Sequence, residues 1–465
     1  MTDQYNPNPA LETSIFKAYD IRGIVDHNFT PDVVYAIGRA FASEAIGNGI
    51  NKVVVAKDGR LSGPKLIKAL TQGLVDSGCD VIDVGVVPTP VLYFATHHLN
   101  TQTGIMLTGS HNPPDYNGLK MVLGGVTLSG DTIQRLRKRI QVQKLRSGEG
   151  TVEKKDVSQA YLSRITSDVQ LKRALRIIVD CGNGVAGELA PKLFQRLGCY
   201  VTELYCKIDG TFPNHHPDPS QPETLKTLIE KVKEGAYDLG LAFDGDGDRL
   251  GVISPDGEII WPDRQMILYA LDVLGRNPGA EIIYDIKCSR NLGKEIERAG
   301  GTATMWKTGH SLVKAKLKET GAPLAGEMSG HIFFKERWFG FDDALYTGAR
   351  LLEILAADHR TTAAVFASLP NSINTPELRL DMREGEHYEF MKHLQQKADF
   401  PDAQVTTIDG LRVDFPDGFG LVRASNTTPC LVIRFEGDNE EAMERIQESF
   451  RALFHSLNSK LALPF

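Results

Sequence analysis

Val53-Val54-Val55-Ala56-Lys57-Asp58 begins a pattern that returns twice more along this chain of 465 residues. The run predicts a short buried β-strand that ends in a polar turn, because β-branched residues favour strands. From Gly63 to Ser77, apolar residues three and four positions apart predict an amphipathic helix. A small-residue turn then leads to another strand, Gly78-Cys79-Asp80-Val81-Ile82. Strand, helix and strand in alternation indicate a layered α/β domain with a largely parallel sheet.

The same order of elements recurs in two later parts of the chain. The second copy comprises Ile177–Gly182, Gly187–Leu197 and Gly198–Val201, and the third Ile282–Lys287, Asn291–Ala299 and Gly300–Ala303. The copies begin near Val53, Ile177 and Ile282, and this period is much longer than that of a solenoid unit. It therefore predicts repeated domains. We therefore expect three related α/β domains with mixed, largely parallel sheets, at residues 1–155, 156–257 and 258–369.

The last part of the chain departs from this pattern. After the linker Pro370–Pro376 come two strand-like runs, Gly410–Phe415 and Leu431–Phe435, and a final helical stretch from Asn439 to about Asn458. We expect residues 370–465 to form a smaller α+β domain.

Each copy of the repeat, followed one strand further, ends in a polar loop. The three loops are Thr108–Asn112, Asp244–Asp248 and Gly326–His331. Ligands of open α/β sheets collect beyond the strand ends. Three related domains would therefore each present one loop to a common central cleft.

The first loop, Thr108-Gly109-Ser110-His111-Asn112-Pro113, places a serine after the apolar run Gly104–Leu107. The Asn-Pro step and the following Pro114 force the chain to turn at once. We expect Ser110 to be displayed to solvent, among backbone N–H groups that suit an anionic group on its oxygen. The alternative is a serine that only hydrogen-bonds its own turn.

The second loop carries Asp244, Asp246 and Asp248 directly after an apolar strand. The intervening glycines let the backbone curl so that the three carboxylates converge. Converging carboxylates repel unless a cation lies between them, and hard oxygen ligands select Mg²⁺ or a similar ion. A calcium-hand loop would need Gly and Glu where this chain has Arg249 and Pro255. A solvated acidic turn would not follow a buried strand so abruptly, so we predict a metal site.

The two loops fit one chemistry. A serine that carries phosphate needs a cation to neutralise the phosphoryl oxygens as the P–O bond breaks. Magnesium takes few protein carboxylates and completes its shell with phosphate or water. We expect one Mg²⁺ per chain, held by the three aspartates and by the oxygen on Ser110.

Bulk composition limits the remaining classes of function. The chain is 42% hydrophobic and 24% charged, as in soluble globular proteins, and no apolar run approaches the roughly 20 residues of a membrane span. The polar N-terminus lacks the layout of a secretory signal, and the six cysteines include no Cys-x-x-Cys pair. We expect a cytoplasmic protein with no membrane partner. The net charge of −7 argues against nucleic-acid binding. We expect a monomer, since no exposed apolar repeat marks a partner face.

Four motifs in order, Phe16–Gly23, Thr108–Pro113, Asp244–Arg249 and Arg423–Pro429, carry a resemblance over nearly the whole chain. They resemble those of the α-D-phosphohexomutase superfamily, and within it the bacterial phosphomannomutase/phosphoglucomutase group. The resemblance implies reversible interconversion of hexose 1-phosphate and hexose 6-phosphate, for mannose and glucose. It also implies a phosphoserine at Ser110, and hexose 1,6-bisphosphate as intermediate and activator.

The resemblance assigns further residues to substrate. It implies that Glu327 and Ser329 hold the sugar's O3 and O4, which glucose and mannose share. It implies that the loop of Arg423, Ser425, Asn426 and Thr427 binds the non-reacting phosphate, and we expect Arg434 to support this loop from the neighbouring strand. The other predicted substrate-contacting residues are Tyr19, Lys287, Thr308, Gly309 and His310.

Near the phosphoserine, the resemblance places Lys120, Arg249 and His331, and we add Arg22 as a charge-neutralising candidate. The general base is His331 or Lys120, because abstraction of the sugar hydroxyl proton depends on reach before pKa. Asp58 and Arg60 also match a family motif. For these two we expect a local ion pair that positions the first helix of the repeat.

Three other functions remain open. An open cleft would discharge the phosphoserine to water and make a sugar phosphatase. A catalytically silent sugar-phosphate-binding paralogue is disfavoured, because the serine, the three aspartates and the sugar loop occur together. Phosphoglucosamine mutase shares much of the plan, but that group typically has Gln at the position of Met328 and a different phosphate loop.

Overall fold

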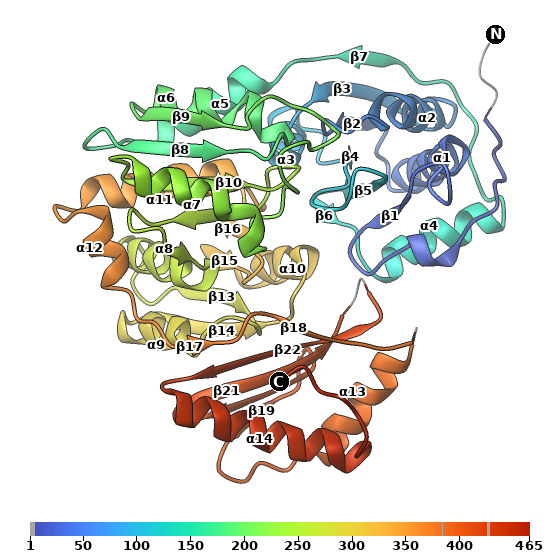
Figure 1. The fold of residues 1–465 in the computed structure, drawn as a ribbon. Coiled ribbons are helices and arrows are strands. Elements are labelled where there is room, and N and C mark those ends of the chain that lie inside the picture. The colour runs from blue at the N-terminus through green and yellow to red at the C-terminus, as the bar shows by residue number, and fades with distance from the viewer. Residues whose placement is uncertain (1–4, 384, 426–427) are drawn as a thin grey trace.

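The computed structural model describes residues 5–383, 385–425 and 428–465, and arranges them in four sheets (Figure 1). The first sheet has the order β1-β5-β4-β2-β3-β7, with β6 paired to β5. Its strands are β1 (Ile21–Ile24), β2 (Lys52–Lys57), β3 (Asp80–Val86), β4 (Gly104–Leu107), β5 (Tyr116–Leu123), β6 (Val126–Thr127) and β7 (Val152–Lys154). Its helices are α1 (Pro31–Gly47), α2 (Gly63–Val75), α3 (Thr89–His98) and α4 (Asp131–Gln141), preceded by the 3₁₀ turn Thr13–Ile15.

The second sheet has the order β12-β11-β10-β8-β9. Its strands are β8 (Arg176–Asp180), β9 (Tyr200–Leu204), β10 (Leu239–Phe243), β11 (Leu250–Ile253) and β12 (Ile259–Ile260). Its helices are α5 (Ser158–Asp168), α6 (Ala190–Arg196) and α7 (Lys226–Glu234), with 3₁₀ turns at Val185–Glu188 and Pro222–Leu225. Because β12 pairs with β11, this sheet continues past residue 257.

The third sheet has the order β14-β13-β15-β16. Its strands are β13 (Glu281–Asp285), β14 (Thr302–Trp306), β15 (Leu324–Gly326) and β16 (Ile332–Phe334). Its helices are α8 (Pro262–Arg276), α9 (Arg290–Arg298), α10 (His310–Thr320), α11 (Ala344–Ala357) and α12 (Thr362–Ala367).

These three sheets share one plan, and the α/β architecture predicted from the repeat is confirmed. In each, a central strand (β2, β8 or β13) lies between two parallel neighbours. The second of these neighbours (β4, β10 or β15) is followed by a strand that pairs with it antiparallel (β5, β11 or β16). The loops β4–β5, β10–β11 and β15–β16 therefore occupy the same position in the three units. They are the loops that carry Ser110, the three aspartates and Glu327.

Close backbone packing supports the first unit. Helices α1 and α2 meet where Gly73 faces the carbonyl of Tyr35, and a Cβ at Gly73 would lie only 2.3 Å from that oxygen. Strand β4 is buried at every position, since elements cover both of its faces. This explains why its sequence is continuously apolar and does not alternate.

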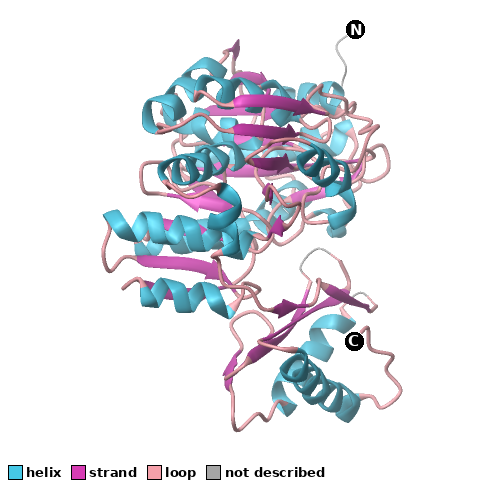
Figure 2. Cartoon of the chain, turned by 60° about the vertical axis from the view of Figure 1, so that its left-hand side comes forward, coloured by secondary structure: helices cyan, strands magenta, loops and turns pink. Residues whose placement is uncertain are grey.

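The fourth sheet is antiparallel throughout, with the order β17-β22-β21-β20-β19 and β18 paired to β22. Figure 2 shows its two helices on one face of the sheet. The elements are β17 (Ile373–Asn374), β18 (Leu378–Asp381), α13 (Glu386–Lys397), β19 (Gln404–Thr406), β20 (Leu411–Phe415), β21 (Gly418–Ala424), β22 (Cys430–Gly437) and α14 (Glu440–Leu457). The smaller C-terminal α+β domain is confirmed.

The hydrophobic cores show which units are joined. One continuous cluster runs from the first unit through the second and third, and includes Val54, Val179 and Leu324. The fourth unit has a core of its own around Phe450. The first three units are thus fused by apolar packing. The fourth adjoins the third through a small apolar cluster of Ile286, Phe419 and Leu421 and through polar contacts such as that of Arg412 with the carbonyl of Ile286. All six cysteines are free and buried. Among the described residues, none of the helices has the length and apolar character needed to span a membrane.

Candidate active site

Ser110 lies in the β4–β5 turn with φ +50°, a left-handed conformation that is uncommon outside glycine and that recurs at functional sites. Its Oγ donates a hydrogen bond to Asp244 Oδ2 at 3.1 Å and lies 3.1 Å from His111 Nδ1. The expectation of a solvent-exposed serine is wrong, because only 1% of Ser110 is accessible. The β10–β11 loop of Asp244–Asp248, called the metal loop below, packs directly on the β4–β5 loop that carries Ser110, called the serine loop. A Cβ at Gly245 would lie 2.3 Å from the carbonyl oxygen of Ser110.

The ion pair predicted between Asp58 and Arg60 is present at 3.2 Å, but its main partner is the serine loop. Arg60 donates to the carbonyl oxygens of Ser110, Asn112, Pro113 and Tyr116. Asp58 Oδ2 accepts from the hydroxyl of Thr108 and from the amide of Gly109. Glycine is needed at 109, since a Cβ there would lie 2.4 Å from the Arg60 guanidinium. The pair therefore shapes the turn that presents Ser110.

The three aspartates of the β10–β11 loop converge as predicted. Each offers a carboxylate oxygen within 4.8 Å of the others, and all three side chains are buried. Among the described residues, Asp246 Oδ1 and Asp248 Oδ1 have no hydrogen-bond partner. Burial and the neighbouring Asp246 and Asp248 raise the pKa of Asp244 well above its ordinary value. A divalent cation would relieve this repulsion and use the unpaired oxygens, so the residues present fit a hard metal ion.

Lys120, on β5, provides the positive charge that this cluster contains. Its Nζ lies 2.7 Å from Asp246 Oδ2 and 2.5 Å from Asp248 Oδ2. Burial alone would lower the pKa of Lys120, but the facing carboxylates raise it above its ordinary value. Asp246 is further held by the hydroxyl of Thr89, at the start of α3. Lys120 is therefore an ammonium that donates hydrogen bonds, and it has no free lone pair for a proton.

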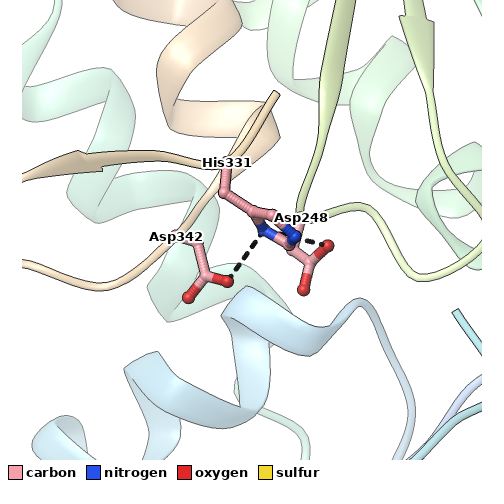
Figure 3. A group of neighbouring side chains, drawn as sticks. All are labelled: Asp248, His331 and Asp342. Atoms are coloured by element: carbon pink, nitrogen blue, oxygen red, sulfur yellow. Dashed lines mark ion pairs between the residues drawn. The ribbon is translucent and has the colours of Figure 1, made fainter. Parts of the chain in front are cut away.

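His331, just before β16, lies beside the metal loop. Arg249 Nε donates to His331 Nε2 at 2.9 Å, and His331 Nδ1 faces Asp342 and Asp248 (Figure 3). The ring of His310 stacks on that of His331, with 5.7 Å between centroids. Arg22, on β1, reaches the same turn through Asn112 and pairs with Asp20. The structure thus brings Ser110, Lys120, Arg249, His331 and Arg22 together around the aspartates.

The predicted sugar-binding residues gather at the β15–β16 loop and the N-terminus of α10. Glu327 accepts from the amide of Gly309, and Tyr19 donates its hydroxyl proton to the carbonyl of Thr308 at 2.9 Å. A Cβ at Gly309 would lie 2.6 Å from the Tyr19 ring, and its φ is +131°, so only glycine fits here. Burial raises the pKa of Glu327 to about 7. Ser329 is half-buried on the same loop, and His310 begins α10.

Of the predicted phosphate-binding residues, Arg423 and Ser425 lie where β21 ends, and Lys287 follows β13 of the third unit. Arg423, at the end of β21, pairs with Asp409, whose carboxylate also accepts from the amide of Thr308 at 3.0 Å. Lys287 donates to Glu377 at 2.6 Å. Ser425 accepts from the amide of Thr428. Asn426 and Thr427 lie outside the described residues.

The expectation that Arg434 supports the phosphate-binding loop is wrong. Its guanidinium donates to the carbonyl of Lys287 and to Asn374, and pairs with Asp263 at 3.4 Å. The register of β21 and β22 places Arg434 opposite Leu421, away from the turn that follows β21. Arg434 therefore ties the fourth unit to the third unit and leaves the phosphate loop to other residues.

Sequence reasoning missed several residues of this site. His111 follows Ser110 directly and could have been singled out by that adjacency. Asp342, Asp409 and Glu377 lie in segments with no motif, and only the fold brings them to the cleft loops. No local signal marked them, because their partners are distant in the sequence.

Comparison with known proteins agrees with this arrangement. Models of phosphoglucomutase/phosphomannomutase α/β/α domains I, II and III match residues 13–147, 159–257 and 261–373. The model of the C-terminal domain of the same family matches residues 377–453. This chain belongs to the phosphoglucomutase/phosphomannomutase family.

Individual members of the phosphoglucomutase/phosphomannomutase family are similar over their full length. Phosphomannomutase/phosphoglucomutase of Pseudomonas aeruginosa is 56% identical over 457 residues, which cover 98% of this chain and 99% of that protein. Phosphoglucomutase of Neisseria gonorrhoeae is 54% identical over 451 residues, 96% and 98% of the two chains. The crystal structure of a family protein from Burkholderia thailandensis superposes with a TM-score of 0.94 at 55% identity, covering 98% of this chain and 100% of that one.

The chain is thus an isomerase of the α-D-phosphohexomutase superfamily that interconverts hexose 1-phosphate and hexose 6-phosphate. Sugar phosphates are its small-molecule partners. Its buried acidic cluster is consistent with a metal cofactor.

Proposed function

We propose that phosphorylated Ser110 gives its phosphoryl group to O6 of a hexose 1-phosphate, or to O1 of a hexose 6-phosphate, with mannose and glucose as the sugars. The observation that carries this proposal is the 3.1 Å contact between Ser110 Oγ and Asp244 within the buried aspartate cluster. The Oγ–P bond breaks as the sugar oxygen forms its bond to phosphorus. The resulting hexose 1,6-bisphosphate turns within the site and returns its other phosphate to Ser110, so added bisphosphate acts as activator.

Asp244, Asp246, Asp248 and the oxygen on Ser110 would hold one Mg²⁺. When bound, the ion supplies positive charge to the transferred phosphoryl oxygens. Lys120 and Arg249 add charge from the protein, and Arg22 supports the serine turn through Asn112.

Between the two candidate bases, we choose His331. Lys120 carries its proton between two carboxylates, whereas His331 Nε2 accepts from Arg249 and so has its lone pair on that nitrogen. Once Arg249 releases this nitrogen, His331 takes the proton of the attacking sugar hydroxyl. The return transfer uses the same group in reverse.

Glu327 and Ser329 would hold the sugar hydroxyls O3 and O4, with Tyr19, Thr308, Gly309 and His310 around the ring. Lys287 and the loop Arg423, Ser425, Asn426 and Thr427 would bind the non-reacting phosphate. In this structure Asp409 pairs with Arg423, and Glu377 pairs with Lys287, so the incoming phosphate must displace both carboxylates. Since the fourth unit has its own core, we propose that it moves to admit substrate and closes afterwards.

The near-complete burial of Ser110 favours a mutase over a phosphatase, because water is kept from the phosphoserine. We propose the domain limits 1–155, 156–260, 261–369 and 370–465, with the second limit moved from residue 257 because β12 belongs to the second sheet. A monomeric state and a cytoplasmic location are also proposals. The last two rest on the sequence alone.

The test compares mannose 1-phosphate, glucose 1-phosphate and glucosamine 1-phosphate with Mg²⁺ and trace bisphosphate. We expect rapid turnover of the first two and inorganic phosphate release far below turnover. Ser110→Ala should abolish protein phosphorylation and nearly all activity, whereas Ser449→Ala, at a partly exposed position of α14, should change neither. Phosphate release that matches turnover would identify a hydrolase, and a preference for the amino sugar would overturn only the choice of substrate.

A further inference from the structure

The buried side chains of Asp248, His331 and Asp342 converge on one point (Figure 3). Each of them also contacts a cationic side chain. Asp248 Oδ2 is bound by Lys120 at 2.5 Å, and Asp342 Oδ1 by Lys314 at 2.8 Å. His331 Nε2 accepts from Arg249 at 2.9 Å. The remaining atoms face one another: His331 Nδ1 lies 3.0 Å from Asp342 Oδ2 and 3.6 Å from Asp248 Oδ1.

The Arg249 contact decides where the imidazole proton lies. An arginine Nε always carries hydrogen, so His331 Nε2 must be the acceptor in this contact. The ring proton is then on Nδ1, the nitrogen that lies within ion-pair distance of two carboxylates. Asp342 is the nearer of the two, and its carboxylate belongs to the third unit, as does His331.

A metal ion at this point is the competing interpretation, since the three groups have suitable ligand atoms. An ion on Nδ1 would require the lone pair there, while Nε2 still accepts from Arg249. The ring would then be an imidazolate, which is the wrong protonation state for a histidine ligand at neutral pH. Lys120, Lys314 and Arg249 also surround the point with positive charge. A proton on Nδ1 therefore fits better than an ion.

Asp342 is suited to hold that proton. Burial would raise its pKa, but Lys314 and the nearby imidazoles hold the pKa well below the ordinary value, so the carboxylate is ionised. The residue is anchored through a backbone bridge to Phe333 on β16. Its partner Lys314 also lies over the ring of Tyr93, 4.2 Å from the centroid. The acceptor has little freedom to turn away from His331.

We propose that Asp342 is a positioning residue for the mutase reaction: it fixes His331 as the Nδ1–H tautomer. The lone pair on Nε2, which accepts from Arg249 in this structure, can then take the sugar hydroxyl proton once that contact opens. This inference rests on the proposed role of His331 as general base. The arrangement follows the general logic by which a carboxylate orients a catalytic histidine.

The test uses Asp342→Asn, in which the amide can donate to Nδ1 and so favour the opposite tautomer. We expect kcat to fall about 10²–10³-fold with KM within about threefold. Transfer from phosphorylated Ser110 to glucose 1-phosphate in a single turnover should slow equally. Long-range ¹H–¹⁵N spectra, with the His331 signals assigned by loss in His331→Gln, should show Nδ1–H in the parent and a shift toward Nε2–H in Asp342→Asn. The matched control is Asp343→Asn, the adjacent buried carboxylate, which binds Tyr161 and not His331; it should retain kcat and the parent spectrum.

The outcomes separate the two levels of the proposal. If His331→Gln leaves single-turnover transfer unchanged, the assignment of the base fails and this inference fails with it. If His331→Gln slows transfer but Asp342→Asn changes neither rate nor tautomer, only the role of Asp342 is overturned. Stoichiometric Zn²⁺ binding to the parent chain that disappears in Asp342→Asn would show a metal site in its place.

Discussion

The Nη2 group of Arg60 donates a hydrogen bond to the carbonyl oxygen of Ser110 at 2.8 Å. The same guanidinium binds three further carbonyls of the serine turn and pairs with Asp58, and its side chain is fully buried. One arginine thus binds four carbonyl oxygens of the turn in which Ser110 has its left-handed conformation.

Arg60→Ala should open the serine turn. It leaves a buried Asp58 carboxylate and four carbonyls without their partner, a loss of about 3–5 kcal/mol for a broken buried pair. We expect amide hydrogen exchange of residues 104–123 to accelerate by at least about 10²-fold, and kcat to fall with it. Arg379→Ala removes an exposed pair with Asp381 and should cost below about 1 kcal/mol. Unchanged exchange in Arg60→Ala would contradict the assigned role.

Asp246→Asn should weaken magnesium binding and leave the fold intact. The substitution removes one charge from the aspartate cluster and retains the side chain's volume. Isothermal titration calorimetry should show a Mg²⁺ Kd at least about tenfold higher, a loss of about 1.4 kcal/mol. Asp256→Asn, in an exposed turn, serves as control and should bind Mg²⁺ like the parent. Equal affinities in both variants would place the ion elsewhere.

Asp409→Asn should strengthen substrate binding. Asp409 pairs with Arg423 and competes with the incoming phosphate for that guanidinium. A neutral amide binds Arg423 less strongly than a carboxylate does, so we expect KM for glucose 1-phosphate to fall about two- to fivefold. This range corresponds to the partial loss of one charge-assisted hydrogen bond between residue 409 and Arg423. In Asp414→Asn, a carboxylate that pairs instead with Arg412, KM should be unchanged. A higher KM in Asp409→Asn would show that Asp409 supports the loop more than it competes.

Stability should depend on pH through Asp343. Burial raises the pKa of this carboxyl from 3.8 to about 7. Between pH 4 and pH 7 the folded chain holds a proton that the unfolded chain releases, so this group's contribution declines as pH rises. Asp343→Asn mimics the protonated form and should raise Tm at pH 8 by about 2–6 °C relative to the parent, with no gain near pH 4. Thermal unfolding followed by circular dichroism measures this difference, and an equal effect at both pH values would exclude Asp343 as its source.

Local patterns in the chain were enough to predict the architecture. The β-branched runs near Val53, Ile177 and Ile282 form the strands β2, β8 and β13, which lie inside the sheets of the three units. The two-residue spacing of the three aspartates predicted their convergence, because strand periodicity and intervening glycines act within a few residues. The resemblance to a family supplied the remaining assignments.

The tertiary structure decided what depends on distant partners. Burial of Ser110 results from the approach of Gly245 across two units, which no local pattern encodes. The sequence predicted that Arg60 positions a helix, but in the structure it supports the serine loop. Its four carbonyl partners come from a different part of the chain, so no local pattern could indicate them. Our proposal of His331 and not Lys120 as the base likewise rests on the positions of Arg249 and the aspartates. The chain alone determined which elements form and where the ionisable side chains stand in the sequence. Protonation and accessibility depend on desolvation and on charges brought close in space, so only the folded molecule settled them.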